Sequence, residues 1–310
     1  MTEPRTRSFH EEIARNKRQS VFIIFVVALL WFAVGIGVGL WFGEPIYGAV
    51  TAVLVTGIQL VVILSAGDTI ALKMMRAIPV SHSDEPRLHN VVEEMSIAAG
   101  QPMPKVYVIR TSALNAFATG MSPNTASIAV TRGLLETLNR EELQGVVAHE
   151  MSHIRNYDIR VAVILAVMVG AIVMLSDFML DMARWGRGSS RSDRGGQAQA
   201  VMMLIALVVA ILAPLFAVML QMAVSRKREY LADASAVELS RNPLALASAL
   251  NKLTMKTAPR MDSPGKAFNH LFIVNPLKSL KQGSSLFDSH PATRDRVTRL
   301  EQMAYLYTGD

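Results

Sequence analysis

Two long apolar blocks near the N-terminus constrain this chain more than any other feature of its sequence. Residues 20–42 and 45–66 contain no Asp, Glu, Lys or Arg. As a helix, each block is long enough to cross roughly 30 Å of hydrocarbon. Only Gly43 and Glu44 lie between them, so the blocks predict a helical hairpin. A cleaved signal peptide would have a shorter apolar core and a small-residue cleavage site, so we expect retained membrane anchors.

The composition supports a membrane protein, because 51% of the residues are hydrophobic and only 18% are charged. Two further apolar blocks, 159–180 and 200–224, are joined by a polar connector rich in Gly and Ser. The remaining segments have the composition of a soluble protein. We therefore predict a mainly α membrane protein with four hydrophobic helices and a cytosolic α+β domain.

Basic residues predict the orientation of the first hairpin, because Lys and Arg favour the cytosolic side of a membrane. They lie before and after the hairpin but not at its tip: Arg5, Arg7, Arg15, Lys17, Arg18, Lys73 and Arg76. Both flanks are thus expected in the cytosol. The net charge of +6 fits attraction to anionic lipid headgroups better than nucleic-acid binding.

The second pair of apolar blocks is harder to orient. Its connector carries four arginines, which the same rule disfavours outside the cytosol: Arg184, Arg187, Arg191 and Arg194. Either the pair spans the membrane with an atypical loop, or it is partly buried against the protein.

These patterns divide the chain into five parts. They are a cytosolic basic N-terminus (1–19), a transmembrane hairpin (20–66), a first soluble part (67–158), a second hydrophobic pair with its polar loop (159–224, loop 182–199) and a second soluble part (225–310).

Within the first soluble part, local patterns predict both helices and strands. Residues 86–100 repeat apolar positions at helical spacing and stop at a glycine, whereas KVYVIR at 105–110 has the composition of a strand. ASIAVTRGLL at 126–135 predicts a second strand that runs into a helix. The segment is therefore expected to be an α+β unit.

The segment from 139 to 158 predicts a metal site on a helix. Asn139 and Glu142 are spaced as a capping box, and His149 and His153 are one helical turn apart. This spacing suits a shared Zn²⁺, and the chain has no cysteine, so a metal must be held by nitrogen and oxygen. Glu150 lies beside the two histidines as a candidate general base and acid.

A catalytic zinc needs a third protein ligand, and Glu229 with Asp233 one turn later offers one. In such a pair, one carboxylate binds the metal and the other orients a ligating histidine. The alternative is that Glu229 only pairs with Arg226 or faces water.

Four motifs give the chain a specific resemblance. They are NAFATG at 115–120, GVVAHEMSHI at 145–154, EYLAD at 229–233 and SHPATRDR at 289–296. In these motifs, and in the order of its apolar segments, the chain resembles the HtpX family of membrane zinc metalloproteases, relatives of the CaaX prenyl endopeptidases. The resemblance implies a zincin-like domain.

It also implies a role for each matching residue. Zn²⁺ would be bound by His149, His153 and Glu229, with catalysis by Glu150 and with Asp233 orienting a ligand. A strand containing Asn115, Ala116, Phe117 and Ala118 would pair with extended substrate, and His290 and Arg296 would stabilise the oxyanion. The alternatives are that Phe117 is a core residue, that Arg296 lies on a solvated helical face and that His290 is a turn residue.

The predicted function is a zinc endopeptidase of a bacterial cytoplasmic membrane that cleaves membrane or misfolded proteins from the cytosolic side, in protein quality control. The alternative is an inactive zinc-stabilised membrane scaffold or partner-binding protein. Glu150 argues against this scaffold, because a structural zinc needs no free base. A prenyl-protein processing enzyme is a third possibility, although four apolar blocks are few for the large chamber that it would require.

Overall fold

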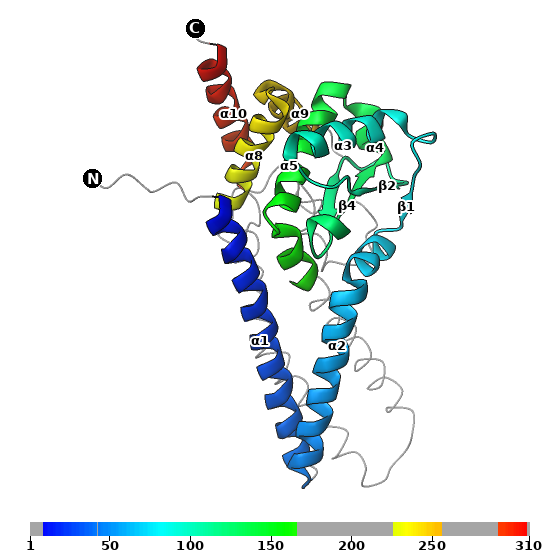
Figure 1. The fold of residues 1–310 in the computed structure, drawn as a ribbon, viewed down its shortest axis with the longest axis vertical. Coiled ribbons are helices and arrows are strands. Elements are labelled where there is room, and N and C mark those ends of the chain that lie inside the picture. The colour runs from blue at the N-terminus through cyan, green and yellow to red at the C-terminus, as the bar shows by residue number, and fades with distance from the viewer. Residues whose placement is uncertain (1–8, 42, 166–225, 256–290, 309–310) are drawn as a thin grey trace, which may run out of the picture.

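A computed structural model describes residues 9–41, 43–165, 226–255 and 291–308 (Figure 1). Two long helices extend from a domain of four strands and shorter helices. Of the predicted third apolar block, residues 159–165 are described and are helical. The rest of that block, the connector, the fourth block and His290 lie outside the described residues.

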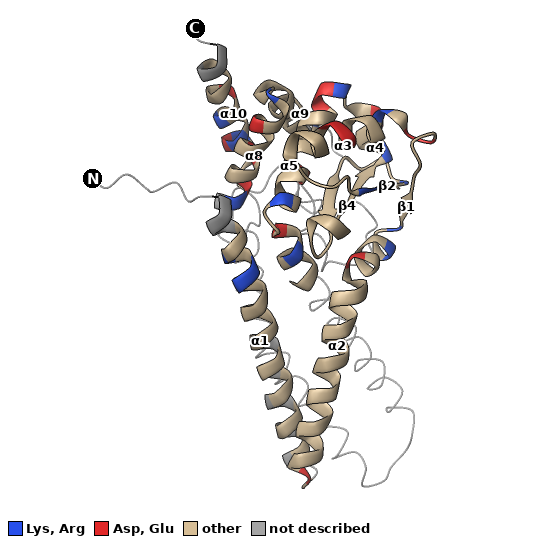
Figure 2. Ribbon diagram, viewed as in Figure 1, with Lys and Arg blue, Asp and Glu red and all other residues tan. Residues whose placement is uncertain are grey.

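The two long helices are α1 (Phe9–Trp41) and α2 (Pro45–Met74), which meet at their shared tip and diverge towards the domain (Figure 1). Their close approach depends on glycine, since a Cβ on Gly48 would lie 2.1 Å from the carbonyl oxygen of Gly35. Between tip and domain the hairpin shows few charged residues (Figure 2). Among the described helices, α2 is long and apolar enough to cross a membrane. This supports one of the four predicted spans.

The domain contains a mixed sheet in the order β1-β2-β4-β3. Its strands are β1 (Ala77–Pro79), β2 (Lys105–Ile109), β3 (Ala116–Thr119) and β4 (Ser127–Thr131), and a short 3₁₀ helix, η1 (Pro123–Thr125), links the last two. β2 and β4 are parallel, whereas β1 and β3 are antiparallel to their neighbours. The two strands predicted from sequence are confirmed, and β3 forms one edge of the sheet.

In the described part of the chain, the domain has six further helices: α3 (Pro86–Ala99), α4 (Arg132–Thr137), α5 (Arg140–Arg155), α8 (Arg226–Ser240), α9 (Pro243–Met255) and α10 (Thr293–Thr308). The predicted end of α3 is confirmed, because Gly100 caps it with a φ of 61°, a conformation that favours glycine. Residues 77–155 contain the four strands and helices α3, α4 and α5, which agrees with the α+β unit expected there.

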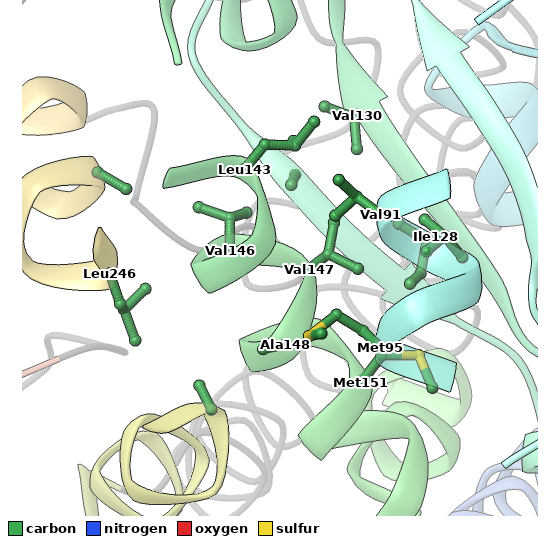
Figure 3. Packing of buried hydrophobic residues seen from close by; sticks show 14 of the residues in the cluster. Val91, Met95, Ile128, Val130, Leu143, Val146, Val147, Ala148, Met151 and Leu246 are labelled. Carbon is green, nitrogen blue, oxygen red and sulfur yellow. The ribbon is translucent and has the colours of Figure 1, made fainter. Parts of the chain in front are cut away.

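The main core lies between one face of the sheet and helices α3, α5 and α9 (Figure 3). Its central side chains include Val91, Met95, Ile128, Val130, Leu143, Val146, Val147, Met151 and Leu246. The next residues along the strands face the opposite way, as the alternation of a strand requires. There, Phe117 and Ala129 pack against Leu72 and Met75 at the end of α2. The sheet is thus held between α5 and the base of the hairpin.

Candidate metal centre

The helix that carries the predicted motif begins with the capping box expected from its sequence. The Asn139 side chain accepts a hydrogen bond from the Glu142 backbone N–H at 2.8 Å, and the Glu142 carboxylate accepts one from the Asn139 N–H at 2.9 Å. Lys252 and Ser248 of α9 also donate to Glu142. Burial alone would raise the pKa of Glu142, but these hydrogen bonds and the Lys252 charge hold it below its usual value.

At the other end of α5, His149 and His153 direct their Nε2 atoms at one point, 3.2 Å apart. Glu229 of α8 completes the group, with carboxylate oxygens 3.7 Å from His149 Nε2 and 3.8 Å from His153 Nε2. The structure therefore brings together two residues that are one turn apart and a third that follows about 80 positions later. Because Glu229 is buried, it does not face water.

A second carboxylate stands behind each histidine. The Oδ1 atom of Asp233 lies 3.1 Å from His149 Nδ1, as the spacing of Glu229 and Asp233 suggested. The Oδ2 atom of Asp158 lies 3.0 Å from His153 Nδ1. These contacts place an acceptor at each Nδ1 and leave both Nε2 atoms facing the centre.

Sequence reasoning missed the contact between Asp158 and His153. The available signal was an acidic residue just beyond the helix that carries the histidines, at a position where the chain turns. Tyr157 has a φ of 61° in this turn. In the protein without metal, burial would lower the pKa of His153, but the hydrogen bond and charge of Asp158, together with Glu229 and Glu150, raise it to about 9.

Arg296 of α10 connects the acidic residues of α8. Its guanidinium donates to both oxygens of Asp233, and its Nη1 lies 3.3 Å from Glu229 Oε2. Burial alone would raise the pKa of Asp233, yet the Arg296 charge and the contact with His149 hold it below its usual value. Arg296 is 2% exposed, so it does not lie on a solvated helical face.

Glu150 is also buried, and it faces the edge of the sheet. The backbone N–H of Ala118 in β3 donates a hydrogen bond to its carboxylate. Burial raises the pKa of Glu150, and the charge of Glu229 adds to this effect, although the two histidines and the Ala118 hydrogen bond oppose it. A carboxyl group in this position can exchange a proton more readily near neutral pH than an exposed glutamate.

The predicted strand around residue 117 is confirmed as β3, and its register decides which groups face Glu150. Asn115 accepts a backbone hydrogen bond from Thr131, and such pairs alternate along antiparallel strands. Ala116 and Ala118 therefore direct their backbone groups away from β4, towards α5. Phe117 packs with the buried side chains at the end of α2, so it is a core residue. The Asn115 side chain accepts a hydrogen bond from the Ala116 N–H.

The donor set fits a zinc ion. Zinc binds imidazole nitrogen at about 2.0–2.1 Å, so two nitrogens on one tetrahedral ion are separated by roughly 3.3 Å. The three Nε2 and carboxylate separations of 3.2, 3.7 and 3.8 Å are close to this value. Two histidines and one glutamate are also a known catalytic zinc set.

A helix bearing His-Glu-x-x-His and facing a carboxylate from a second helix defines the class of metallopeptidases. The comparison with protein families agrees, because the model of peptidase family M48 matches residues 82–304. This chain belongs to peptidase family M48. The prediction of a metalloprotease is thereby confirmed.

Within that family, the curated relatives similar to this chain include HtpX homologues. The "Protease HtpX homolog" of Listeria monocytogenes serotype 4a is 43% identical over 303 residues, which cover 94% of this chain and 99% of the relative. The protein of the same name from Limosilactobacillus reuteri is 43% identical over 298 residues, covering 95% and 99%. The similarity therefore includes the hairpin as well as the domain, and the HtpX resemblance is confirmed.

Among solved structures, the crystal structure of Ste24p from S. mikatae resembles this fold. The TM-score is 0.50 at 17% sequence identity, and the match covers 94% of this chain and 67% of that one. The likeness supports the fold. The M48 family match and the HtpX relatives support the prediction of a membrane metalloprotease.

Proposed function

We propose that this protein is a zinc endopeptidase in which His149, His153 and Glu229 hold the metal. The observation that carries this proposal is the convergence of their three ligand atoms, all within 4.8 Å of one another, where His149 and Glu229 are buried and His153 is half-buried. Zinc in such a donor set acts as a Lewis acid that activates water and polarises the scissile carbonyl. The protein's own residues then have to bind the peptide and move protons.

Glu150 is the proposed proton carrier. It lies next to His149 in the sequence, faces the same centre and has a raised pKa, so its carboxylate can accept a proton from water and pass it to the leaving amine. The hydrogen bond from the Ala118 N–H holds this carboxylate at the edge of the sheet. The proposed base would therefore lie against the edge of β3 that is proposed to bind substrate.

The edge of β3 opposite β4 is the proposed substrate site. An extended peptide can add to a sheet edge by backbone hydrogen bonds, which read its shape more than its sequence. Ala116 and Ala118 present the outward backbone groups of this edge, and both side chains are small. The side chain of Asn115 would contribute by holding the Ala116 N–H, and Phe117 by fixing the strand from behind.

Arg296 and Asp233 are proposed to hold the ligands in place. Arg296 contacts both Asp233 and Glu229, and Asp233 contacts His149, so one guanidinium supports two of the three ligands. Stabilisation of the oxyanion by Arg296 and by His290, which the resemblance implies, stays a prediction.

The hairpin supports a proposal for the substrates and the location. An apolar helix leads directly into the sheet that carries the substrate edge, so the active site is expected near a membrane surface. We propose membrane or misfolded proteins as substrates, cleaved on the cytosolic side of a bacterial inner membrane in protein quality control. The basic residues at the domain end of α1 support this orientation (Figure 2).

The Glu150→Gln variant tests the proposal. The purified, zinc-loaded protein should cleave an unfolded polypeptide such as casein, whereas the variant should retain zinc at the same stoichiometry and lose cleavage by at least about 100-fold. Zinc content measured beside cleavage separates loss of the base from loss of the metal. Zinc binding without cleavage in the parent protein would instead support the zinc-stabilised scaffold.

A further inference from the structure

Helix α1 contributes a buried polar side chain to the neighbourhood of the metal centre. Asn16 is 1% exposed, and its Nδ2 donates to the Asn156 carbonyl oxygen and to Asp158 Oδ1, both at 2.7 Å. Because both neighbours are acceptors, the amide must present its NH₂ group to them. Because this buried asparagine donates two hydrogen bonds to the turn at residues 156–158, it holds that turn in place.

A second side chain of α1 reaches the other half of the centre. Gln19 Oε1 accepts a hydrogen bond of 2.6 Å from Arg228 Nη2, and Arg228 directly precedes Glu229. Arg228 Nη1 also lies 3.4 Å from Asp158 Oδ1. The two side chains of α1 therefore contact two residues that also contact each other. Beside them, Lys17 Nζ stands 4.5 Å from the centre of the Tyr157 ring. The turn at residues 156–158 and the start of α8 thus both contact the same part of α1.

Each of these two side chains of α1 is linked to a proposed zinc ligand through one other residue. Asp158 uses its other oxygen to bind His153 Nδ1, so Asn16 acts on His153 through Asp158. Gln19 acts on the start of α8, where Glu229 lies, through Arg228. We propose that Asn16 and Gln19 are positioning residues of the metal centre, which makes the anchor helix α1 a structural part of that centre. The inference rests on the proposed zinc site.

The physical reason is that a ligating histidine needs a fixed partner at its second nitrogen. A carboxylate that is itself held by hydrogen bonds keeps the imidazole in one tautomer and one orientation, and loss of such partners typically weakens metal binding about 10- to 100-fold. Asp158 is held from α1 by Asn16 and from α8 by Arg228. Separation of α1 from the domain would therefore weaken the site without removing a ligand.

The test measures zinc affinity of the full-length protein in detergent by competition with a chromogenic chelator. Asn16→Ala should weaken zinc binding about tenfold. Arg18→Ala, on an exposed position of the same helix, is the matched control and should leave the affinity unchanged. Asp158→Ala should weaken binding at least as much, and adding Asn16→Ala to it should cost little more, because both changes act on His153. Equal affinities of the parent and Asn16→Ala would overturn the inference.

A second measurement separates positioning from general stability. The absorption bands of bound Co²⁺ report ligand geometry, and Asn16→Ala should change them, whereas Arg18→Ala should not. A lower melting temperature in the presence of chelator, with unchanged zinc affinity and cobalt spectrum, would mean a structural role and would also overturn the inference. If the parent protein and its His149→Ala variant bound zinc equally, the proposed zinc site itself would be wrong, which is a distinguishable result.

Discussion

The guanidinium of Arg296 binds both carboxylate oxygens of Asp233, at 2.8 Å from Nε and 2.6 Å from Nη2, across 63 positions of the sequence. Both residues are buried, and Arg296 also faces Glu229. One cation thus offsets two carboxylates in the interior, and it joins α10 to α8 at the point where α8 meets His149 and His153.

Removal of this cation should be costly. Arg296→Ala leaves Asp233 and Glu229 buried together without their arginine, and breaking a buried ion pair on one side typically costs about 3–5 kcal/mol. Denaturant unfolding of the metal-free protein should show this loss. Arg296→Lys keeps the charge but not the two-pronged contact, so it should lose less stability.

Arg294→Ala, an exposed arginine in the same helix, is the control for this prediction and should change the unfolding free energy by less than about 0.5 kcal/mol. If Arg296→Ala were as stable as this control, the buried ion pair would contribute nothing to the fold.

Zinc affinity should increase with pH. The metal-free protein holds a proton on His153 with a pKa of about 9, and zinc can bind only after that proton leaves. The apparent affinity should therefore rise by up to tenfold per pH unit below about pH 9 and then level off. Chelator competition at several pH values measures it, and an affinity independent of pH between 7 and about 9 would contradict the pKa of His153.

The same proton should stabilise the metal-free fold. Because the pKa of His153 is raised from 6.5 in the unfolded chain to about 9 in the folded protein, its contribution is fully present below about pH 6.5 and is lost as the pH rises through 9. Thermal unfolding of chelator-treated protein should show this decline. Asp158→Asn removes the principal group that raises the pKa and should reduce the pH dependence.

Gly145→Ala should destabilise the domain although alanine is the better helix former. A Cβ at this position would lie 2.9 Å from the backbone nitrogen of Leu246, so α9 would have to move away from α5. Overpacking of this kind typically costs about 1–3 kcal/mol. Gly57→Ala, inside α2, where a Cβ meets nothing within 4 Å, is the matched control and should cause no loss of stability.

Asn139→Ala should weaken the start of the zinc helix. The substitution removes the acceptor for the Glu142 N–H, and loss of such a cap typically costs about 1 kcal/mol. Cleavage by the zinc-loaded protein should change little at low temperature, because the cap lies at the opposite end of α5 from His149 and His153. A large loss of zinc binding in this variant would show that the two ends of α5 are coupled.

Local patterns in the sequence were sufficient for several parts of this protein. The capping box at Asn139, the placement of His149 and His153 on one helical face and the end of α3 at Gly100 depend only on residues a few positions apart. The hairpin follows from two uncharged apolar blocks with two residues between them. Local hydrogen bonding and helical periodicity decide such features, so they can be read from the chain.

Other parts of the site depend on contacts between distant segments. The sequence placed Glu229 and Asp233 as candidates, but only the packing of α8 against α5 brings Glu229 within 3.8 Å of the histidines. From sequence, Arg296 could also have been placed on a solvated helical face, and its burial excludes that alternative. The register of β3 with β4 decides which backbone groups of β3 face away from the sheet. The sequence of one strand alone does not determine that register.

Asn16 and Asp158 show the same division most clearly. The sequence by itself predicted a hairpin of two long apolar helices and placed His149 and His153 on one helical face. Only the tertiary structure decided that Asn16, 142 positions before Asp158, supplies the hydrogen bond behind His153. The physical reason is that a polar side chain carries no local signal of its partner, because the partner is chosen when burial removes it from water and a distant group replaces that water.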